Sequence, residues 1–188
     1  MVKFGLCRIL RADHEMSQPP STPQLLRSIR VWLTIFIVGL ILSGVTAFPL
    51  EHETRWLASF ATTHAIFPDG ITLWLVRVHD ALDDNSIRYP FLAYGTDWLA
   101  FAHLVLAVVF LGPLRDPVRN KWVLQFGLVA CLGVLPLALI AGPLRGIPPL
   151  WRLIDCSFGI FGAIPLLICL RLTSQLEQSA PASSPISS

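Results

Sequence analysis

Charged residues are scarce in this chain. Only 14% of its 188 residues are Asp, Glu, Lys or Arg, whereas about a quarter is typical of a soluble domain. The formal net charge is +2, and the basic residues are spread over short segments. This composition excludes an ordinary soluble domain. It also argues against nucleic-acid binding, which needs basic side chains concentrated on one face.

Cysteine is equally scarce, and its spacing carries no motif. No CxxC pair occurs, and three of the four cysteines lie inside apolar runs, where a thiol behaves as a small apolar side chain. A disulfide framework or a zinc ribbon is therefore a poor interpretation. We expect structural thiols at these positions, which are Cys7, Cys131, Cys156 and Cys169.

Familiar catalytic motifs are absent as well. The chain has no Gly-rich phosphate loop, no GxSxG elbow and no HExxH zinc motif. Ser157, His103 and Asp155 are the residue types of a hydrolase triad, but Ser157 falls inside a predicted helix with no sign of an elbow. The sequence therefore identifies no catalytic residue and leaves open whether the protein is an enzyme.

Long apolar runs are what the chain does have, and hydrophobic residues make up 54% of it. Each run is close to the roughly 20 residues that a helix needs to cross the hydrocarbon of a bilayer. We predict an all-α integral membrane protein, a four-transmembrane-helix bundle within residues 29–171. Its predicted spans are residues 29–49, 92–112, 122–141 and 151–171. Residues 1–28, which are basic, and 172–188, rich in Ser, Ala and Pro, are predicted to be disordered tails.

The basic residues predict the orientation of the spans. Nine fall on one side: Lys3, Arg8, Arg11, Arg27, Arg30, Arg115, Arg119, Lys121 and Arg171. By the positive-inside rule, both termini are then cytoplasmic and the loop of residues 50–91 lies outside. Val45-Thr46-Ala47 resembles a signal-peptidase site, but the basic segment before it is unusually long, which favours an uncleaved anchor.

The outer loop carries helical periodicity of its own. Apolar residues at i, i+3, i+4, i+7 and i+11 predict an amphipathic helix on the outer surface. They are Ile71, Trp74, Leu75, Val78 and Leu82. A shorter helix is predicted before it, ended by Pro68-Asp69-Gly70.

A tetrapeptide, Gly-Pro-Leu-Arg, occurs at residues 112–115 and again at residues 142–145. Gly-Pro stops a helix and Arg reaches toward headgroups, so each copy is predicted to end its span. Asp116-Pro117 is interpreted as the N-cap and first residue of the next helix.

Small and polar residues form a stripe on each of three predicted spans, and such stripes let membrane helices approach closely. His103 belongs to the stripe of Thr96, Ala100 and Ala107. We therefore expect its side chain to face the bundle interior rather than lipid. The other stripes are Gly127, Cys131, Val134, Ala138 and Ala141, and Arg152, Asp155, Gly159, Gly162 and Ala163.

Ionisable side chains within the spans mark the candidate site. From the ~1.5 Å rise per residue, Asp97 and Asp155 lie about 6–7 Å below the outer boundary, and His103 about 16 Å below it. Arg145 and Arg152 lie at the level of the two aspartates. Charged groups cost about 2.5–3.5 kcal/mol each at the bilayer centre, so they are usually paired, hydrated or functional. The sequence predicts a polar cluster that opens to the outside, with His103 at its floor.

Two interpretations of this cluster stay open. It can be a set of ion pairs, for example Arg152 with Asp97, that only orders the bundle. It can instead be a pocket for a polar or lipid-derived ligand, or a proton path from Asp97 or Asp155 to His103. The first would suit a non-catalytic accessory subunit of a membrane complex, and the second a ligand-binding membrane protein. A transporter would need a homo-oligomer, because four spans leave little room for alternating access.

No cofactor is predicted, although haem and metal sites are minor alternatives. Only His103 lies in a span, so a second haem ligand would have to come from His52, His64 or His79. His79 and Asp83, at i and i+4 of one helix, are weak candidates for a metal site.

Three segments resemble a known family. They run from Tyr94 to His103 (YGTDWLAFAH), from Gly112 to Asn120 (GPLRDPVRN) and from Trp151 to Cys156 (WRLIDC). Over roughly residues 92–160 the chain resembles a family of bacterial multi-span inner-membrane proteins to which no activity is attached. The resemblance implies a bacterial inner membrane and no particular function.

Overall fold

The computed structural model describes residues 21–64 and 67–179 and contains only helices over these ranges. The helices are α2 (Thr22–Ala47), α3 (Leu50–His64), α4 (Asp69–Arg88), η1 (Pro90–Leu92), α5 (Ala93–Val109), α6 (Leu111–Arg115), α7 (Lys121–Pro136), η2 (Leu137–Ala141), α8 (Gly142–Leu144) and α9 (Pro149–Ser179). The predicted all-α class is confirmed.

Four helical segments are long and apolar enough to cross a membrane, as predicted. They are Thr22–Ala47, Pro90–Arg115, Lys121–Leu144 and Pro149–Ser179. The third continues past Pro136 through η2, a wider π-helical turn. Proline has no backbone N–H to donate, and the wider turn accommodates the missing hydrogen bond.

The first and last spans are longer than predicted, so the predicted tail boundaries are wrong. Residues 22–28 and 172–179, assigned to disordered tails, are helical. Ser21 and Gln24 form a capping box that starts α2, and Lys121 Nζ lies 2.6 Å from Glu177 Oε2 near the end of α9. Polar caps and ion pairs extend a helix beyond its apolar stretch, and hydropathy does not detect them. The rest of the predicted tails lies outside the described residues.

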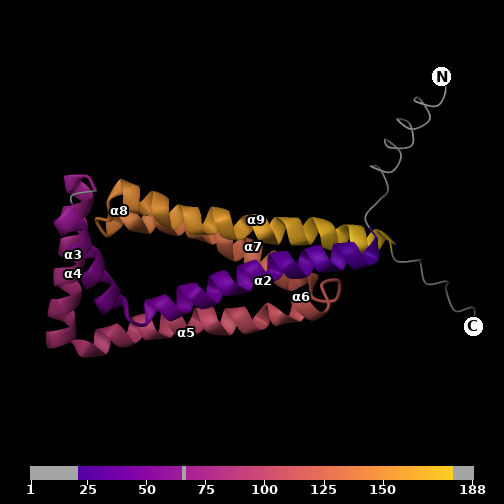
Figure 1. Ribbon diagram of the computed structural model, residues 1–188, viewed down its shortest axis with the longest axis horizontal. Coiled ribbons are helices and arrows are strands. Elements are labelled where there is room, and N and C mark those ends of the chain that lie inside the picture. The colour runs from indigo at the N-terminus through magenta and orange to yellow at the C-terminus, as the bar shows by residue number, and fades with distance from the viewer. Residues whose placement is uncertain (1–20, 65–66, 180–188) are drawn as a thin grey trace, which may run out of the picture.

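The spans are arranged as two pairs (Figure 1). α2 packs against α5, α7 packs against α9, and α2 also packs against α9, which joins the pairs. Thr22 and Ser179 lie at the same end of the bundle, here called the terminal end, and α3 and α4 lie across the opposite end, here called the hairpin end. An even number of spans requires this placement of the two ends.

The buried core lies toward the terminal end, where α6 contacts both α2 and α7. Phe110 is its centre: the ring is 2% exposed and lies edge-on to Phe36, with 4.7 Å between centroids. A Cβ on Gly127 would lie 2.5 Å from Phe110 Cζ and 2.9 Å from Leu166 Cδ1. Glycine at 127 therefore lets the ring of Phe110 pack against the backbone of α7. The remaining core residues are Ile29, Leu33, Ile37, Ala107, Val123, Leu124 and Cys169.

Small residues hold each pair together, as their stripes predict. A Cβ on Gly44 of α2 would lie 2.9 Å from the Ala100 carbonyl oxygen and 3.1 Å from His103 Cβ on α5. A Cβ on Gly159 of α9 would lie 2.5 Å from the Cys131 carbonyl oxygen on α7. These backbone approaches set the spacing within the pairs.

The predicted amphipathic helix is confirmed as α4, which pairs with α3. Leu75 is buried, and Arg55 of α3 lies 3.6 Å from Asp83 of α4. Pro68 caps α4, while Asp69 and Gly70 are its first residues. The predicted stop is therefore a helix start, because Pro before an acidic first turn suits an N-terminus equally well.

Both Gly-Pro-Leu-Arg copies lie at span ends, as predicted: α6 ends at Arg115 and α8 at Leu144. The predicted helix start at Asp116-Pro117 is wrong, because α7 begins at Lys121. Asp116 Oδ1 accepts a hydrogen bond from the Arg119 N–H, but this closes only a turn. Asn120 Nδ2 then donates to the carbonyl oxygens of Gly112 and Asp116, which satisfies the end of α6.

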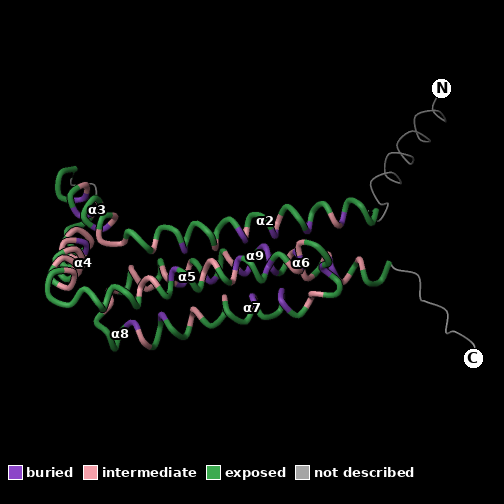
Figure 2. The backbone as a smooth tube through the Cα atoms, turned by 90° about the horizontal axis from the view of Figure 1, so that it is seen from below, coloured by how far each residue is buried: buried purple, intermediate pink, exposed green. Residues whose placement is uncertain are grey.

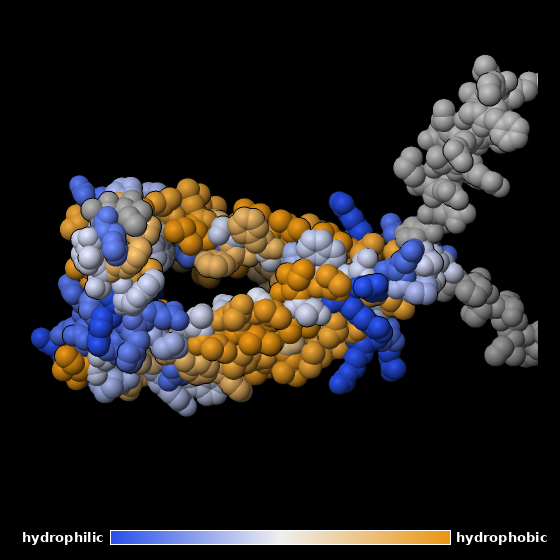
Figure 3. Space-filling view, in the orientation of Figure 1, coloured by the Kyte–Doolittle hydropathy of each residue, from blue (hydrophilic) through white to orange (hydrophobic). Residues whose placement is uncertain are grey.

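Large apolar side chains cover the outside of the spans. Most residues along the tube in Figure 2 are exposed, and the space-filling view shows an apolar surface between two hydrophilic ends (Figure 3). Val129, Phe158 and Phe161 are each 69% exposed. An apolar surface of this extent requires contact with lipid.

We predict that Gly159→Ala destabilises the bundle. The added Cβ would meet a backbone carbonyl oxygen at 2.5 Å, which no rotamer change relieves, so α7 and α9 must move apart. Overpacking of this kind costs about 1–3 kcal/mol of unfolding free energy. Thermal unfolding in detergent micelles measures the effect. Gly39→Ala is the matched control, because nothing lies within 4 Å of its Cβ and alanine favours a helix. Equal melting temperatures for the two variants would contradict this packing.

Candidate functional site

An opening separates the two helix pairs toward the hairpin end. In the space-filling view it passes between the α2–α5 pair and the α7–α9 pair, and α3 and α4 lie across its outer end (Figure 3). We call this opening the inter-pair cleft. It lies between the spans where the sequence places ionisable groups.

Helix register gives His103 and Asp155 similar distances toward the hairpin end, although counting from the predicted span boundaries gives depths of about 16 Å and 6 Å. Phe36 of α2 is near Gly162 of α9, and Gly44 of α2 is in contact with His103. Gly44 lies eight residues beyond Phe36, about 12 Å toward the hairpin end. Asp155 lies seven residues before Gly162 on the antiparallel α9, about 10.5 Å in the same direction.

Three side chains share one helical register relative to the packed core. Seven residues are close to two helical turns, so residues seven apart share a face. Each of three residues lies seven positions closer to the hairpin end than a residue where the spans meet. They are Ser43 after Phe36, His103 before Phe110, and Asp155 before Gly162. In the core the faces of Phe36, Phe110 and Gly162 meet, and two turns closer to the hairpin end the same faces carry Ser43, His103 and Asp155. The expectation that His103 faces the bundle interior agrees with its contact with Gly44.

His103 is held in one tautomer. Its Nδ1 lies 2.8 Å from the Leu99 carbonyl oxygen, which can only accept, so Nδ1 carries the proton and donates it. In the neutral ring Nε2 is then an acceptor. Over the described residues Nε2 has no hydrogen-bond partner, so it is available to a ligand or to water.

Asp155 has no ion-pair partner among residues 21–64 and 67–179. It is half-buried on α9. Ser157, two positions on, lies on a different face of the helix, and its Oγ donates to the Ile154 carbonyl oxygen at 2.6 Å. The described structure therefore does not assemble Ser157, His103 and Asp155 into a triad.

Asp97 lies on a different face of α5 from His103. It is six residues from His103, which rotates it about 120° around α5. The pair of Arg152 with Asp97, offered as the purely structural interpretation, is not among the ion pairs of the described residues. All of those pairs lie on α3 and α4 or at the ends of α7 and α9.

Arg152 packs into the α8–α9 contact. A Cβ on Gly142 would lie 2.6 Å from Arg152 Cδ and 2.9 Å from its Cγ, so the glycine provides the space for the side chain's stem. The Nε atom is buried and has no hydrogen-bond partner within the described ranges. Arg152 therefore lies beside Asp155 along the chain but is held against α8.

Arg145 lies in a second small site at the hairpin end. Gly146, with φ of 70°, makes the turn after α8 and brings Arg145 toward α4. A pocket of about 180 Å³ results, here called the arginine notch. It is lined by Trp74, Arg77, Val78, Ala81, Arg145 and Gly146. Neither arginine belongs to an ion pair of the described chain, and Trp74 Nε1 is buried without a partner there.

The notch presents only hydrogen-bond donors from its polar side chains, since indole N–H and guanidinium groups cannot accept. Its chemistry therefore matches an anion. Sequence reasoning missed Trp74 and Arg77 as site residues, since the helical pattern assigned them to the apolar and polar faces of α4. It missed Ser43 as well, because its register with His103 follows only from long-range contacts.

The other histidines lie on α3 and α4. His52 and His64 are exposed on α3, and His64 packs against Phe60 with 4.6 Å between ring centroids. His79 is half-buried on α4, and Asp83, its proposed metal partner, lies 3.6 Å from Arg55. Across the described residues no group of three or more His, Cys, Asp or Glu is placed to hold a metal ion.

No protein-family model, curated protein or solved structure matches this chain.

We predict that the inter-pair cleft is hydrated at the level of Ser43. A cysteine there should react several times faster with a membrane-impermeant maleimide than a cysteine at Leu42, because the attacking thiolate forms only where water is present. Leu42 is the matched control: it is adjacent in sequence, 58% exposed and on another side of α2. Mass spectrometry of the labelled protein measures both rates after subtraction of wild-type labelling. Equally slow reaction at the two positions would show that the cleft is dry.

Proposed function

We propose that this chain is a multi-pass protein of a bacterial inner membrane that binds a polar or lipid-derived ligand in the inter-pair cleft. The observation that supports it most is the pair His103 and Asp155. From helix register we place both beside the opening, and neither has an ion-pair partner in the described structure. Ionisable groups at this depth are costly unless a ligand, water or another group compensates them.

The proposed orientation places both termini in the cytoplasm. Within the described residues the terminal end carries basic side chains with few acids around them, including Arg27, Arg30, Arg115 and Arg119. The hairpin end mixes basic side chains with acidic ones such as Asp83 and Asp84. By the positive-inside rule the terminal end is cytoplasmic, and the cleft then opens in the outer leaflet.

The kind of ligand follows from the two sites at the hairpin end. The arginine notch offers donors to an anionic group, and the cleft offers His103 Nε2, Asp155 and Ser43 to polar groups. Apolar helix surface lies along the spans beside the cleft. An amphiphile with an anionic head and an apolar body would match this arrangement. We place the head at Arg77 and Arg145, and the body between the helix pairs.

We predict that two single variants, Asp155→Asn and His103→Gln, each release a ligand that the wild type retains. Loss of a hydrogen bond to a charged group costs about 1.5–3 kcal/mol, which is roughly a tenfold to hundredfold loss of affinity. Native mass spectrometry of protein released from nanodiscs measures the extra mass and its occupancy. The matched control is Asp97→Asn, which removes the same charge from a span but lies on a different face of α5 from His103 and should retain the ligand.

Two outcomes would contradict this function. A wild-type protein of bare mass would leave the cleft without a ligand. An extra mass that proves to be a second polypeptide would favour the alternative, an accessory subunit whose cleft receives a partner helix.

A further inference from the structure

A groove runs along the outer surface of α2 near the terminal end. It has a volume of about 540 Å³, and its described lining comes entirely from α2: Pro23, Arg27, Arg30, Val31, Thr34 and Ile35. Pro23, Arg27, Val31 and Ile35 recur every four residues and form one ridge, and Arg30 and Thr34 form the next. Side chains four apart on a helix make such ridges, with a groove between them.

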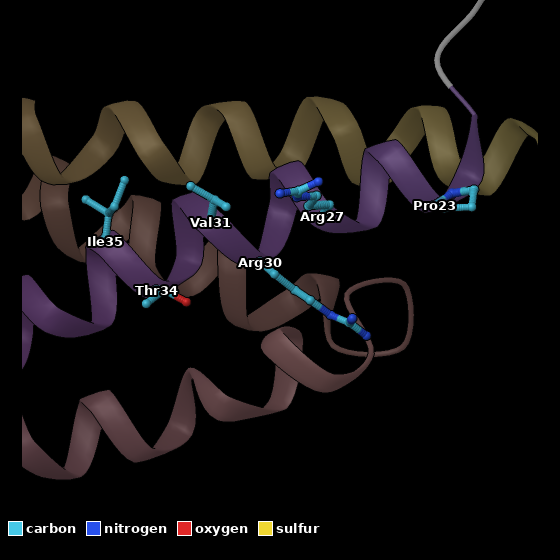
Figure 4. Close-up of a pocket in the computed structure, with 6 residues that line it drawn as sticks. All are labelled: Pro23, Arg27, Arg30, Val31, Thr34 and Ile35. Atoms are coloured by element: carbon cyan, nitrogen blue, oxygen red, sulfur yellow. The ribbon is translucent and has the colours of Figure 1, made fainter.

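The end of the groove nearer the helix start is cationic. Figure 4 shows Arg27 on the same ridge as Val31, while the guanidinium of Arg30 extends from the other ridge toward the connection between α6 and α7. Both arginines are exposed, and no ion pair of residues 21–64 and 67–179 involves them. The connection itself carries Arg119 and ends at Lys121. An anion at this end of the groove would therefore meet Arg27 from one ridge and Arg30 from the other.

The other end of the groove is apolar. Val31 and Ile35 are 52% and 53% exposed, and both extend from α2 away from its buried face. From Arg27 to Ile35 the groove descends about 12 Å along the helix axis, from headgroup depth into the hydrocarbon. A positive head region followed by an apolar channel is the shape of a phospholipid with an anionic headgroup.

We propose that this groove, here called the α2 groove, is a binding site for one anionic phospholipid, with its phosphate between Arg27 and Arg30 and an acyl chain along Val31 and Ile35. Basic pockets at the cytoplasmic side of membrane helices are suited to such headgroups. The site is independent of the inter-pair cleft and lies at the opposite end of the molecule. It assigns Arg27 and Arg30 a role in lipid selection beyond their contribution to orientation.

The test titrates phosphatidylglycerol into the full-length protein in detergent and counts bound lipids by native mass spectrometry. One phosphatidylglycerol should bind more tightly than the next, and phosphatidylcholine should not replace it. A basic residue near a membrane surface contributes about fivefold to the affinity for an anionic lipid. We therefore expect Arg27→Gln with Arg30→Gln to weaken the first binding step roughly 25-fold.

The matched control is Arg115→Gln with Arg171→Gln, which removes the same charge from the terminal end without touching the lining of the groove. It should weaken the first step less than threefold. An equal loss in both double variants would mean diffuse surface charge and would overturn the site. Displacement of the lipid by inorganic phosphate would identify a simple anion site and would also overturn it. A wild-type protein without a tight first lipid-binding step would also overturn the site. That result is expected if residues of its own chain fill the groove.

Discussion

The contact of Phe110 with Gly127, Leu166 and Phe36 is the constraint on which the rest of this structure depends. It is where all four spans come together, and a side chain at residue 127 would not fit beside the ring. Because the helices meet here and are long, any divergence in their directions increases with distance from the junction. The helix pairs separate on the hairpin side, where close glycine contacts act within each pair but not between them. The inter-pair cleft is thus a consequence of how one aromatic ring packs.

The paired and the unpaired ionisable side chains of the described residues lie in different parts of the bundle. The ion pairs of the described residues lie at the ends of the bundle, where water screens them and each contributes little to stability. Within the membrane the ionisable groups are unpaired instead, and two of them border the cleft. A bundle ordered by buried ion pairs would show the opposite distribution. The unpaired state of His103 and Asp155 therefore favours a site over a structural cluster.

Local patterns predicted the elements of this fold well. Hydropathy found the four spans, period-3.6 spacing found α4, and small-residue stripes found the sides on which the pairs pack. Those signals are contained within one helix. The start of α2 depends on a capping box, and the loop before α7 depends on the bonds from Asn120 to Gly112 and Asp116. Hydropathy registers neither.

The site was predictable only in part, because its assembly is long-range. Polarity and depth mark His103 and Asp155 as candidates, yet they mark Asp97 equally with Asp155, and Asp97 lies on a different face of α5 from His103. The approach of Arg145 to Arg77 depends on how α4 lies across the bundle end, which no periodicity within α4 encodes. Ser43 became a candidate only once the contacts of Phe36 set the register of α2 against α9.

The path of α4 connects the arginine notch to both helix pairs that border the cleft. α4 is covalently joined to α5, in one helix pair, and it meets Arg145 beside α8, in the other. The arginine notch is therefore a second joint between two helix pairs that otherwise meet along α2 and α9 and around Phe110. An anion held by Arg77 and Arg145 together would favour the separation at which both reach it. By thermodynamic linkage, whatever the cleft holds would then alter the affinity of the notch, and the notch would alter that of the cleft by the same factor.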